Sequence, residues 1–437
     1  MQSPVERSYP ACRLGKQLAF TATCLALALG GCAKGTAARD LSVWIMRPGN
    51  ISAASSFFAA ESARFEHAHP GVHVEVQFIP WLSAHDKLVT SLAGDIPPDI
   101  SELGSTWTPE FAAVGALAQV DDITQALGGG AAFVAALAAS ARLPDGHAYG
   151  IPWYAGARAL LYRKSRFARA HLAPPRTLAE LRTAAQRLTD HARGRYGFAL
   201  MGNNAPLFYP LVWENGGDFA RSRNGHWRST LAHGRAAVQA LSYLDDLYRS
   251  GVAPRGAIAW SDLDGRTAFG QGTVAMTITG SWSLPSIYAA HPELEGDVGI
   301  IPYPSGRPGG PSLSFVGGSH LAIFKHCAQP ALARAFILQL LDDRAQRAWA
   351  STVGFFPAKA ALVRSTIAGG TTPHQSRTFA DALLAGRTTP AAPGWGAIEG
   401  ALTIPTMVQA VLTGQATPER AVARAAAEMN DLLESER

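Results

Sequence analysis

The sequence predicts an α/β fold, because helical segments, turns and short apolar strands alternate along most of the chain. Positions 72, 74, 76 and 78 are apolar and alternate with polar residues, which is the period of a strand. The segment 51–67 before them has the pattern of a helix, which His69-Pro70-Gly71 ends because proline disfavours helix in the residue before it. A helix at 84–93 and a strand at 99–103 repeat this order. We therefore expect an α/β lobe with a mostly parallel sheet.

The same order of elements continues through the rest of the chain. Further strands are expected at 41–46, 157–162, 196–201, 272–279, 299–303 and 314–324. Further helices are expected over 178–188, 236–249, 331–341 and 345–351, with an Ala-rich helix from 418 onward. Thr177 to Glu180 has the spacing of a capping box, and Pro418 occupies a first helical position, where proline is tolerated.

The N-terminus has the pattern of an export signal. Arg7, Arg13 and Lys16 give a positive start, 17–29 is mostly apolar, and two glycines precede Cys32. The apolar part is shorter than the about 20 residues of a membrane span. Small residues directly before a cysteine resemble the lipobox of bacterial lipoproteins. This resemblance implies a signal peptide over 1–31, lipid on the Cys32 sulfur and a tether over 32–40. An ordinary secretory signal with an incidental cysteine, or an uncleaved anchor, is the alternative.

Composition limits the class of protein. The chain has 437 residues, 47% of them hydrophobic and 16% charged, and a length of this kind usually forms two domains or lobes. Lys and Arg are scattered among Asp and Glu, which argues against a nucleic-acid partner. Cys12 and Cys24 lie in the signal, so a lipidated Cys32 would leave Cys327 single. We then expect neither a disulfide nor a cysteine metal site in the mature chain.

A search for catalytic motifs is mostly negative. The chain has no G-x-S-x-G elbow, no G-x-x-x-x-G-K-[ST] phosphate loop and no H-E-x-x-H zinc motif. Four carboxylates could in principle form a glycosidase pair, although hydrogen-bonding or surface roles are favoured: Glu102, Glu110, Glu214 and Asp218. We therefore expect no enzyme, no cofactor and no metal.

Aromatic residues are placed more informatively. Several follow expected strands in segments rich in Gly, Pro or Ser, namely Trp81, Trp107, Trp153, Tyr154, Trp282 and Trp395. Ligands of open α/β sheets bind at the carboxyl ends of strands. Aromatic planes pack on the apolar faces of sugar rings, and polar groups bond the ring hydroxyls. Packing in the core is the alternative for each aromatic. Trp349 is assigned to the core and Trp227 to a loop outside any cleft.

An ordered series of short motifs resembles the extracellular solute-binding proteins of the maltose-binding type. The series contains Phe65-Glu66 with Pro70-Gly71, Leu92-Ala93-Gly94 with Pro98-Asp99-Ile100, Gly150-Ile151-Pro152, Asn215-Gly216-Gly217, Phe269-Gly270-Gln271-Gly272, Gly280-Ser281-Trp282, Gly317-Gly318-Ser319 and Gly354-Phe355-Phe356-Pro357. Each piece is weak alone, but their order along almost the whole mature chain is specific.

The resemblance implies an architecture. It is a two-lobe fold of the type II periplasmic-binding-protein class, with mixed sheets flanked by helices and a hinge between the lobes. By this pattern the N-terminal lobe comprises 41–153 plus 305–353, and the C-terminal lobe comprises 154–304 plus 354–437. The chain would cross between lobes near 152–157, near 302–306 and near 354.

The resemblance also implies a ligand site in the cleft between the lobes. Trp282 falls where maltose-type receptors stack a tryptophan on a sugar, and Gly318 and Ser319 fall in a turn of backbone donors. Ser105, Thr106, Trp107, Tyr154 and Asn204 fall on cleft-facing loops, and Trp81 and Trp395 are candidate stacking walls. The chain departs from the pattern at Gly156, where maltose-type receptors have an acidic residue. The stretch 393–398 offers no Arg or Lys for a phosphate, so a neutral sugar ranks above a phosphate ester.

The resemblance therefore implies the substrate-binding receptor of an ABC sugar importer. It would capture a di- or oligosaccharide by hinge closure and deliver it to permease subunits driven by a separate ATPase. We expect an exported monomer, anchored by lipid to the outer face of the cytoplasmic membrane and without a nucleic-acid partner. The alternatives are a receptor for glycerol phosphate, a polyol or another small polar solute, and a secreted carbohydrate-active enzyme.

Overall fold

The computed structural model describes residues 39–368 and 377–434. The expected signal peptide, Cys32 and residues 32–38 of the tether lie outside the described residues. The chain is built around a mixed sheet whose strands follow the order β2-β1-β3-β10-β4-β8-β5, with β9 and β11 also paired to β4. The strands are β1 (Arg39–Met46), β2 (Val72–Ile79), β3 (Ile100–Gly104), β4 (Ile151–Arg163), β5 (Tyr196–Phe198), β8 (Val274–Gly280), β9 (Val298–Ile301), β10 (Val316–Ile323) and β11 (Phe356–Pro357).

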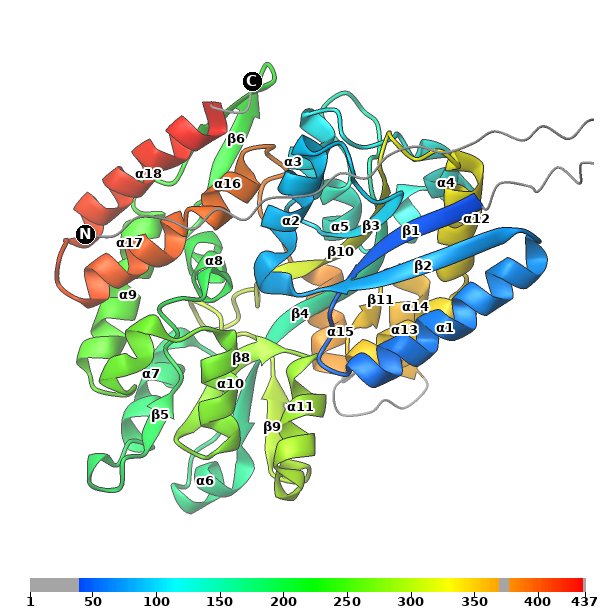
Figure 1. The fold of residues 1–437 in the computed structure, drawn as a ribbon. Helices are drawn as coiled ribbons and strands as arrows, with labels where there is room; N and C mark the ends of the chain where they lie inside the picture. The colour runs from blue at the N-terminus through cyan, green and yellow to red at the C-terminus, as the bar shows by residue number, and fades with distance from the viewer. Residues whose placement is uncertain (1–38, 369–376, 435–437) are drawn as a thin grey trace, which may run out of the picture. The chain divides into compact units, whose positions relative to one another are not determined.

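Helices flank this sheet, so the expected α/β class is confirmed (Figure 1). The first are α1 (Ile51–Ala68), α2 (Trp81–Ala93), α3 (Thr108–Ala113), α4 (Asp121–Ala126) and α5 (Ala135–Ser140). The middle of the chain contains α6 (Lys164–Arg169), α7 (Leu178–Arg187), α8 (Ala205–Glu214), α9 (Ala236–Arg249), α10 (Asp262–Gly270) and α11 (Ser283–Ala290). The last are α12 (Pro330–Leu340), α13 (Asp343–Val353), α14 (Ala360–Ala368), α15 (Arg377–Ala385), α16 (Trp395–Gly400), α17 (Thr403–Leu412) and α18 (Pro418–Glu434).

The expectation of a mostly parallel sheet is confirmed for the first three strands and is wrong for the sheet as a whole. β1 runs parallel to β2 and β3, and β5 runs parallel to β8. β10 is antiparallel to both β3 and β4, and β4 is antiparallel to β8, β9 and β11. The reason is that β10 and β4 arrive from distant parts of the chain, and pairing of that kind leaves no trace in the local apolar pattern. The sheet is mixed, as the fold class in the family resemblance implies.

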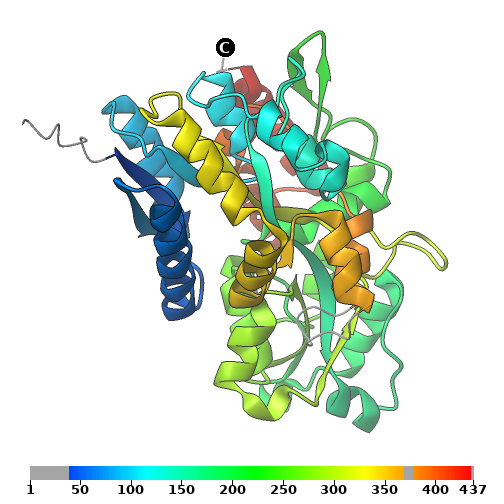
Figure 2. The same cartoon turned by 90° about the vertical axis from the view of Figure 1, so that its right-hand side faces the viewer.

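β4 changes its pairing partners part-way along its length. It is the teal strand at the centre of Figure 2. Its first half, from Ile151 to Ala157, pairs with β10, while Arg158 to Tyr162 pair with β8. Its first eleven residues are buried, which is typical of a strand covered on both faces. The junction between residues 157 and 158 lies at the end of the stretch where the resemblance implies a crossover.

Local sequence signals account for many element boundaries. The expected helices at 51–67, 84–93, 236–249 and 331–341 agree with observed helices to within a few residues. Thr177 caps α7 by accepting from the Glu180 N–H, but the Glu180 carboxylate accepts from the N–H of Arg176 and not from that of Thr177. The expected capping box is therefore only half formed.

Two further expectations concern tryptophans. Trp349 is buried as expected, and its ring stacks on Trp153 with centroids 4.7 Å apart. Trp227 does not lie in a loop, because β6 (Ala220–Arg223) and β7 (His226–Ser229) form a two-stranded hairpin. α18 packs against this hairpin and against α17 and α9.

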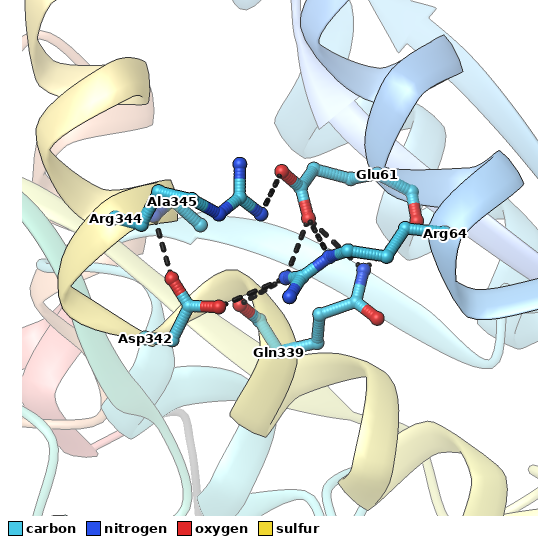
Figure 3. Close-up of polar contacts among 6 residues, drawn as sticks. All are labelled: Glu61, Arg64, Gln339, Asp342, Arg344 and Ala345. Atoms are coloured by element: carbon cyan, nitrogen blue, oxygen red, sulfur yellow. Dashed lines mark hydrogen bonds and ion pairs between the residues drawn. The ribbon is translucent and has the colours of Figure 1, made fainter. Parts of the chain in front are cut away.

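A buried carboxylate joins α1 to the α12–α13 segment (Figure 3). Glu61 of α1 accepts from Arg64 at 2.8 Å, from Arg344 at 2.6 Å and from the Gln339 amide at 3.0 Å. Arg64 also reaches Asp342 at 2.9 Å, and Asp342 caps α13. The hydrogen bonds satisfy a carboxylate that would otherwise be costly to bury.

None of the described helices is long and apolar enough to cross a membrane.

Candidate ligand-binding site

A cavity of about 280 Å³ opens at the N-terminal ends of α8 and α10 and beside α16 and α17. Its polar lining comes from Asn203, Asn204, Asp262 and Glu399, and Tyr209 contributes an aromatic ring. The expected site residue Asn204 is thus placed at this cavity. A few polar groups around a partly apolar wall are typical of a small-molecule site.

Glu399 connects the cavity to the loop that follows β3. The side chain is half-buried, and its carboxylate accepts from Thr106 Oγ1 at 2.8 Å and from Trp395 Nε1 at 3.1 Å. Burial raises the pKa of Glu399, because the charged form loses hydration. Thr106, which was expected on the basis of the family resemblance, therefore lies next to the cavity, whereas sequence reasoning missed Glu399.

Two expected aromatics lie together beside this loop. The rings of Trp81 and Trp107 have centroids 5.5 Å apart, and Trp81 is 40% exposed. Trp81 begins α2 and Trp107 is the N-cap of α3, so these residues stand at helix starts and not in loops as expected. His85 lies 5.4 Å from the Trp107 ring and bonds Glu110 at 2.9 Å, which raises the pKa of His85. The exposed face of this pair is available for stacking.

Trp282 is held against β4 by two glycines. A Cβ added to Gly156 would lie 2.5 Å from the Trp282 ring, and one added to Gly280 would lie 1.9 Å from it. The departure from the family pattern at Gly156 therefore makes room for this indole. Trp282 stacks on Phe355 with centroids 4.8 Å apart and planes 11° apart, so part of its π surface is already covered.

Tyr154 and Ser319 lie in a buried cluster around Glu102. Ser319 Oγ donates to Glu102 Oε1 at 2.6 Å, the Tyr154 hydroxyl donates to the same oxygen, and the Met46 N–H donates to Oε2 at 2.8 Å. Burial raises the pKa of Glu102 to about 7, although these three hydrogen bonds oppose the shift. All three side chains are less than a tenth exposed, so they connect β1, β3, β4 and β10 and do not face solvent.

Gly318 and Ser105 are joined by a backbone hydrogen bond of 2.9 Å from the Ser105 N–H to the Gly318 oxygen. Gly318 lies within β10, so the expected turn of backbone donors is a strand. A Cβ on Gly318 would lie 2.2 Å from the Tyr154 carbonyl oxygen, which explains why glycine is needed here. Ser105 is 2% exposed, so it supports the loop that carries Thr106.

Trp395 has no exposed face in this structure. Its ring is fully buried and packs near Phe219 and Tyr209, with centroids 5.9 and 6.2 Å apart. Its indole N–H serves Glu399. We expected Trp395 to stack on a sugar, but a sugar cannot reach a ring that is fully buried.

The four carboxylates that could have formed a glycosidase pair all have hydrogen-bond partners within the protein. Glu214 accepts from the Gly306 N–H at 3.1 Å, and Asp218 pairs with Arg387 at 3.1 Å. Glu102 and Glu110 are bonded as described above. Within residues 39–368 and 377–434, no group of three or more His, Cys, Asp and Glu side chains could hold a metal ion.

Comparison with known families decides the class of this protein. Residues 49–347 match the model of the bacterial extracellular solute-binding proteins. The chain belongs to this family. Its relatives include the diacetylchitobiose binding protein DasA of Streptomyces coelicolor, which is 28% identical over 403 residues, covering 92% of this chain and 91% of DasA.

Solved structures of other solute-binding proteins have the same fold. One is the solute binding protein of Thermotoga lettingae TMO bound with alpha-D-tagatose, with a TM-score of 0.77 and 27% identity over 90% of this chain and 100% of that one. Another is the GacH receptor of Streptomyces glaucescens GLA.O, solved unliganded and with acarbose, with a TM-score of 0.77 and 25% identity over 90% and 98% of the two chains. The relatives are binding proteins, and the family is extracellular.

Sequence reasoning missed a second charged residue of this solute-binding protein, besides Glu399. Arg158 stands in β4 among buried apolar residues and is only 9% exposed. The available signal was its charge within the apolar run 155–161, since buried arginines are rare unless paired.

Proposed function

We propose that this chain is the receptor of an ABC sugar importer and that it binds a di- or oligosaccharide. The observation that carries the proposal is the cavity lined by Asn204, Tyr209 and Asp262, which Glu399 connects to the loop of Trp107. Polar side chains around an aromatic ring suit a sugar, which has apolar faces and a hydroxyl rim. The ligands named for its relatives are all sugars: diacetylchitobiose and acarbose are oligosaccharides, and tagatose is a monosaccharide.

The mechanism is capture by closure of two lobes, 41–153 plus 305–353 and 154–304 plus 354–437. The change of pairing in β4 between residues 157 and 158 supports a crossover there. The ligand binds the closed form more tightly and shifts the population toward it, without any covalent step. Permease subunits with a separate ATPase then take the sugar. The receptor is a monomer held outside the cytoplasmic membrane by lipid on Cys32.

A thermal-shift screen of the purified full-length chain tests the proposal. The panel contains mono- and oligosaccharides, polyols and glycerol phosphates, and a ligand of the native state raises the Tm by mass action. Trp81→Ala removes the most exposed ring of the site and should weaken sugar binding by roughly 2- to 12-fold. Trp227→Ala, in the β6–β7 hairpin, is the matched control and should leave binding unchanged.

Two results would contradict the proposal. A Tm shift with glycerol phosphates or polyols and with no saccharide would transfer the assignment to a receptor for small polar solutes. Turnover of a glycoside by the purified chain would make it a carbohydrate-active enzyme.

A further inference from the structure

Arg158 is a buried cation without a carboxylate partner in the described part of the chain. Its side chain is more than nine-tenths buried, and no Asp or Glu oxygen of residues 39–368 and 377–434 lies within 4 Å of its guanidinium. Its Nε is sealed from solvent and has no hydrogen-bond partner. Buried charges are costly unless they are paired. This arginine therefore either lowers the stability of the fold without any return or serves as a binding group whose partner is a ligand.

The terminal nitrogens of Arg158 are the atoms that a partner can reach. Neither terminal nitrogen donates a hydrogen bond to a described residue. Of the three guanidinium nitrogens, only Nε is both inaccessible to solvent and without a partner, so the two terminal nitrogens remain accessible. The planar end of a guanidinium presents parallel N–H groups that match the two oxygens of a carboxylate.

The surroundings of Arg158 hold it in place. Its Cζ lies 5.1 Å from the ring centre of Trp282 and 5.2 Å from that of Phe315, and both contacts favour a cation. Its backbone N–H donates to Ser314 Oγ at 3.0 Å, and Ser314 Oγ donates back to the Arg158 carbonyl at 2.9 Å. A side chain fixed in this way loses little conformational entropy when it binds a ligand.

Arg158 is not itself a lining residue of the cavity but lies one side chain away from the lining. Its Cζ faces Phe315, whose ring centroid is 5.2 Å from that of Tyr209, and Tyr209 lines the cavity. Asp262, which also lines the cavity, is the carboxylate whose charge acts most on the guanidinium. Asp262 lies too far from the guanidinium for an ion pair, and its Oδ1 accepts from Thr279 at 2.9 Å. Asp262 offsets part of the arginine charge without satisfying its donors. This balance suits a ligand with one negative charge better than a dianion.

We propose that Arg158 is a specificity-determining residue of this receptor and that the ligand is an acidic saccharide whose uronic-acid carboxylate binds the guanidinium. The inference rests on the proposed function, since it places a sugar in this cavity. Within it, Trp282 and Phe315 are positioning residues that hold the arginine. Three of the carboxylates near the cavity have other partners, because Asp262 bonds Thr279 and Glu399 bonds both Thr106 and Trp395, while Glu110 bonds His85.

Isothermal titration of the purified full-length chain tests this inference. The probes are disaccharides of galacturonic, glucuronic, mannuronic and guluronic acid, each with the neutral counterpart that has a hydroxymethyl group in place of each carboxylate. Sugar phosphates form a third arm. We expect one acidic disaccharide to bind about 10- to 100-fold more tightly than its neutral counterpart, as a charge-assisted hydrogen-bond pair predicts.

Three variants assign the preference to Arg158. Arg158→Gln should abolish the preference for the acid, and Arg158→Lys should keep only part of it, because an ammonium group has the charge without the fork. Arg387→Gln is the matched control, since its guanidinium also lies 5.0 Å from a tryptophan ring, that of Trp213, but is paired with Asp218. It should keep the wild-type preference. The Tm of each variant reports whether it folds, and the wild-type comparison needs no variant.

Four outcomes would overturn the inference. The first is that the wild-type chain binds neutral disaccharides as tightly as acidic ones, which would leave the sugar-receptor assignment intact. The second is that Arg158→Gln retains the preference. The third is that sugar phosphates bind more tightly than the uronic acids. The fourth is that no saccharide of any arm binds, which would also remove the proposed function.

Discussion

Glu102 should make the stability of this protein fall as the pH rises toward neutrality. Its carboxyl group is fully buried where β1, β3, β4 and β10 meet, and burial raises its pKa from an ordinary 4.5 to about 7. A carboxyl group whose pKa is raised on folding binds its proton more tightly in the folded state. The folded state is therefore favoured at low pH, and this advantage is lost between about pH 4.5 and pH 7.

The size of the effect follows from the two pKa values. A change from 4.5 to about 7 corresponds to about 3 kcal/mol, because one pKa unit is worth about 1.4 kcal/mol. Between pH 5 and pH 8 the free energy of unfolding should fall by about 2.5 kcal/mol through this group alone. The substitution Glu102→Gln removes the titration, because an amide stays neutral.

The assay is urea denaturation of the wild-type chain and of Glu102→Gln at pH 5 and pH 8. The quantity compared is the change in unfolding free energy between the two pH values. Within each chain this change cancels any constant cost of placing an amide near the Met46 N–H, and subtracting the change in Glu102→Gln from that in the wild type cancels the other titrating groups. Glu75→Gln, on the exposed side of β2, is the control and should behave as the wild type. Equal pH dependence in the wild type and Glu102→Gln would refute the reasoning.

Three further changes test other parts of the structure. Glu61→Ala should lower the unfolding free energy by about 1.5–3 kcal/mol, because it removes charge-assisted hydrogen bonds. The control Arg377→Ala, in an exposed i,i+4 pair, should change the unfolding free energy by less than about 0.5 kcal/mol. Equal effects of the two variants in urea denaturation would contradict this expectation. Gly280→Ala should lower the unfolding free energy by about 1–3 kcal/mol and change the fluorescence of Trp282, since the new Cβ would lie 1.9 Å from the ring. An unchanged Tm and an unchanged fluorescence spectrum would count against the packing of Trp282 on Gly280. The hydrogen bond to Glu110 raises the pKa of His85. The stability that this raised pKa contributes is therefore present below about pH 6.5 and is lost as the pH rises through the pKa of the folded state. An NMR titration in which Glu110→Gln leaves the His85 pKa unchanged would exclude Glu110 as the cause of the shift.

Local patterns in the sequence predicted most elements correctly. The strand at 72–79 follows from strict alternation, and α1 ends next to Pro70 because proline disfavours helix before it. The helix at 236–249 follows from its amphipathic pattern. These signals act over a few residues, so a single sequence is enough to read them.

Burial of single side chains was less predictable. Trp81 and Trp395 have similar sequence surroundings, with a proline or glycine just before them, but Trp81 is 40% exposed and Trp395 is fully buried. The difference arises because Trp395 packs among aromatic side chains that come from α8 and from the segment before β6. No pattern within a few residues of either tryptophan contains that information.

The sequence by itself determined the α/β class, the positions of most helices and strands, and the family to which the chain belongs, because these depend on local periodicity, caps and the order of short motifs. Tertiary structure alone decided the mixed direction of the sheet, the contact of Trp282 with Gly156, the bond from Thr106 to Glu399 and the unpaired state of Arg158. Each of these joins residues far apart in the chain. Their energies depend on packing and desolvation, which exist only once the chain has folded.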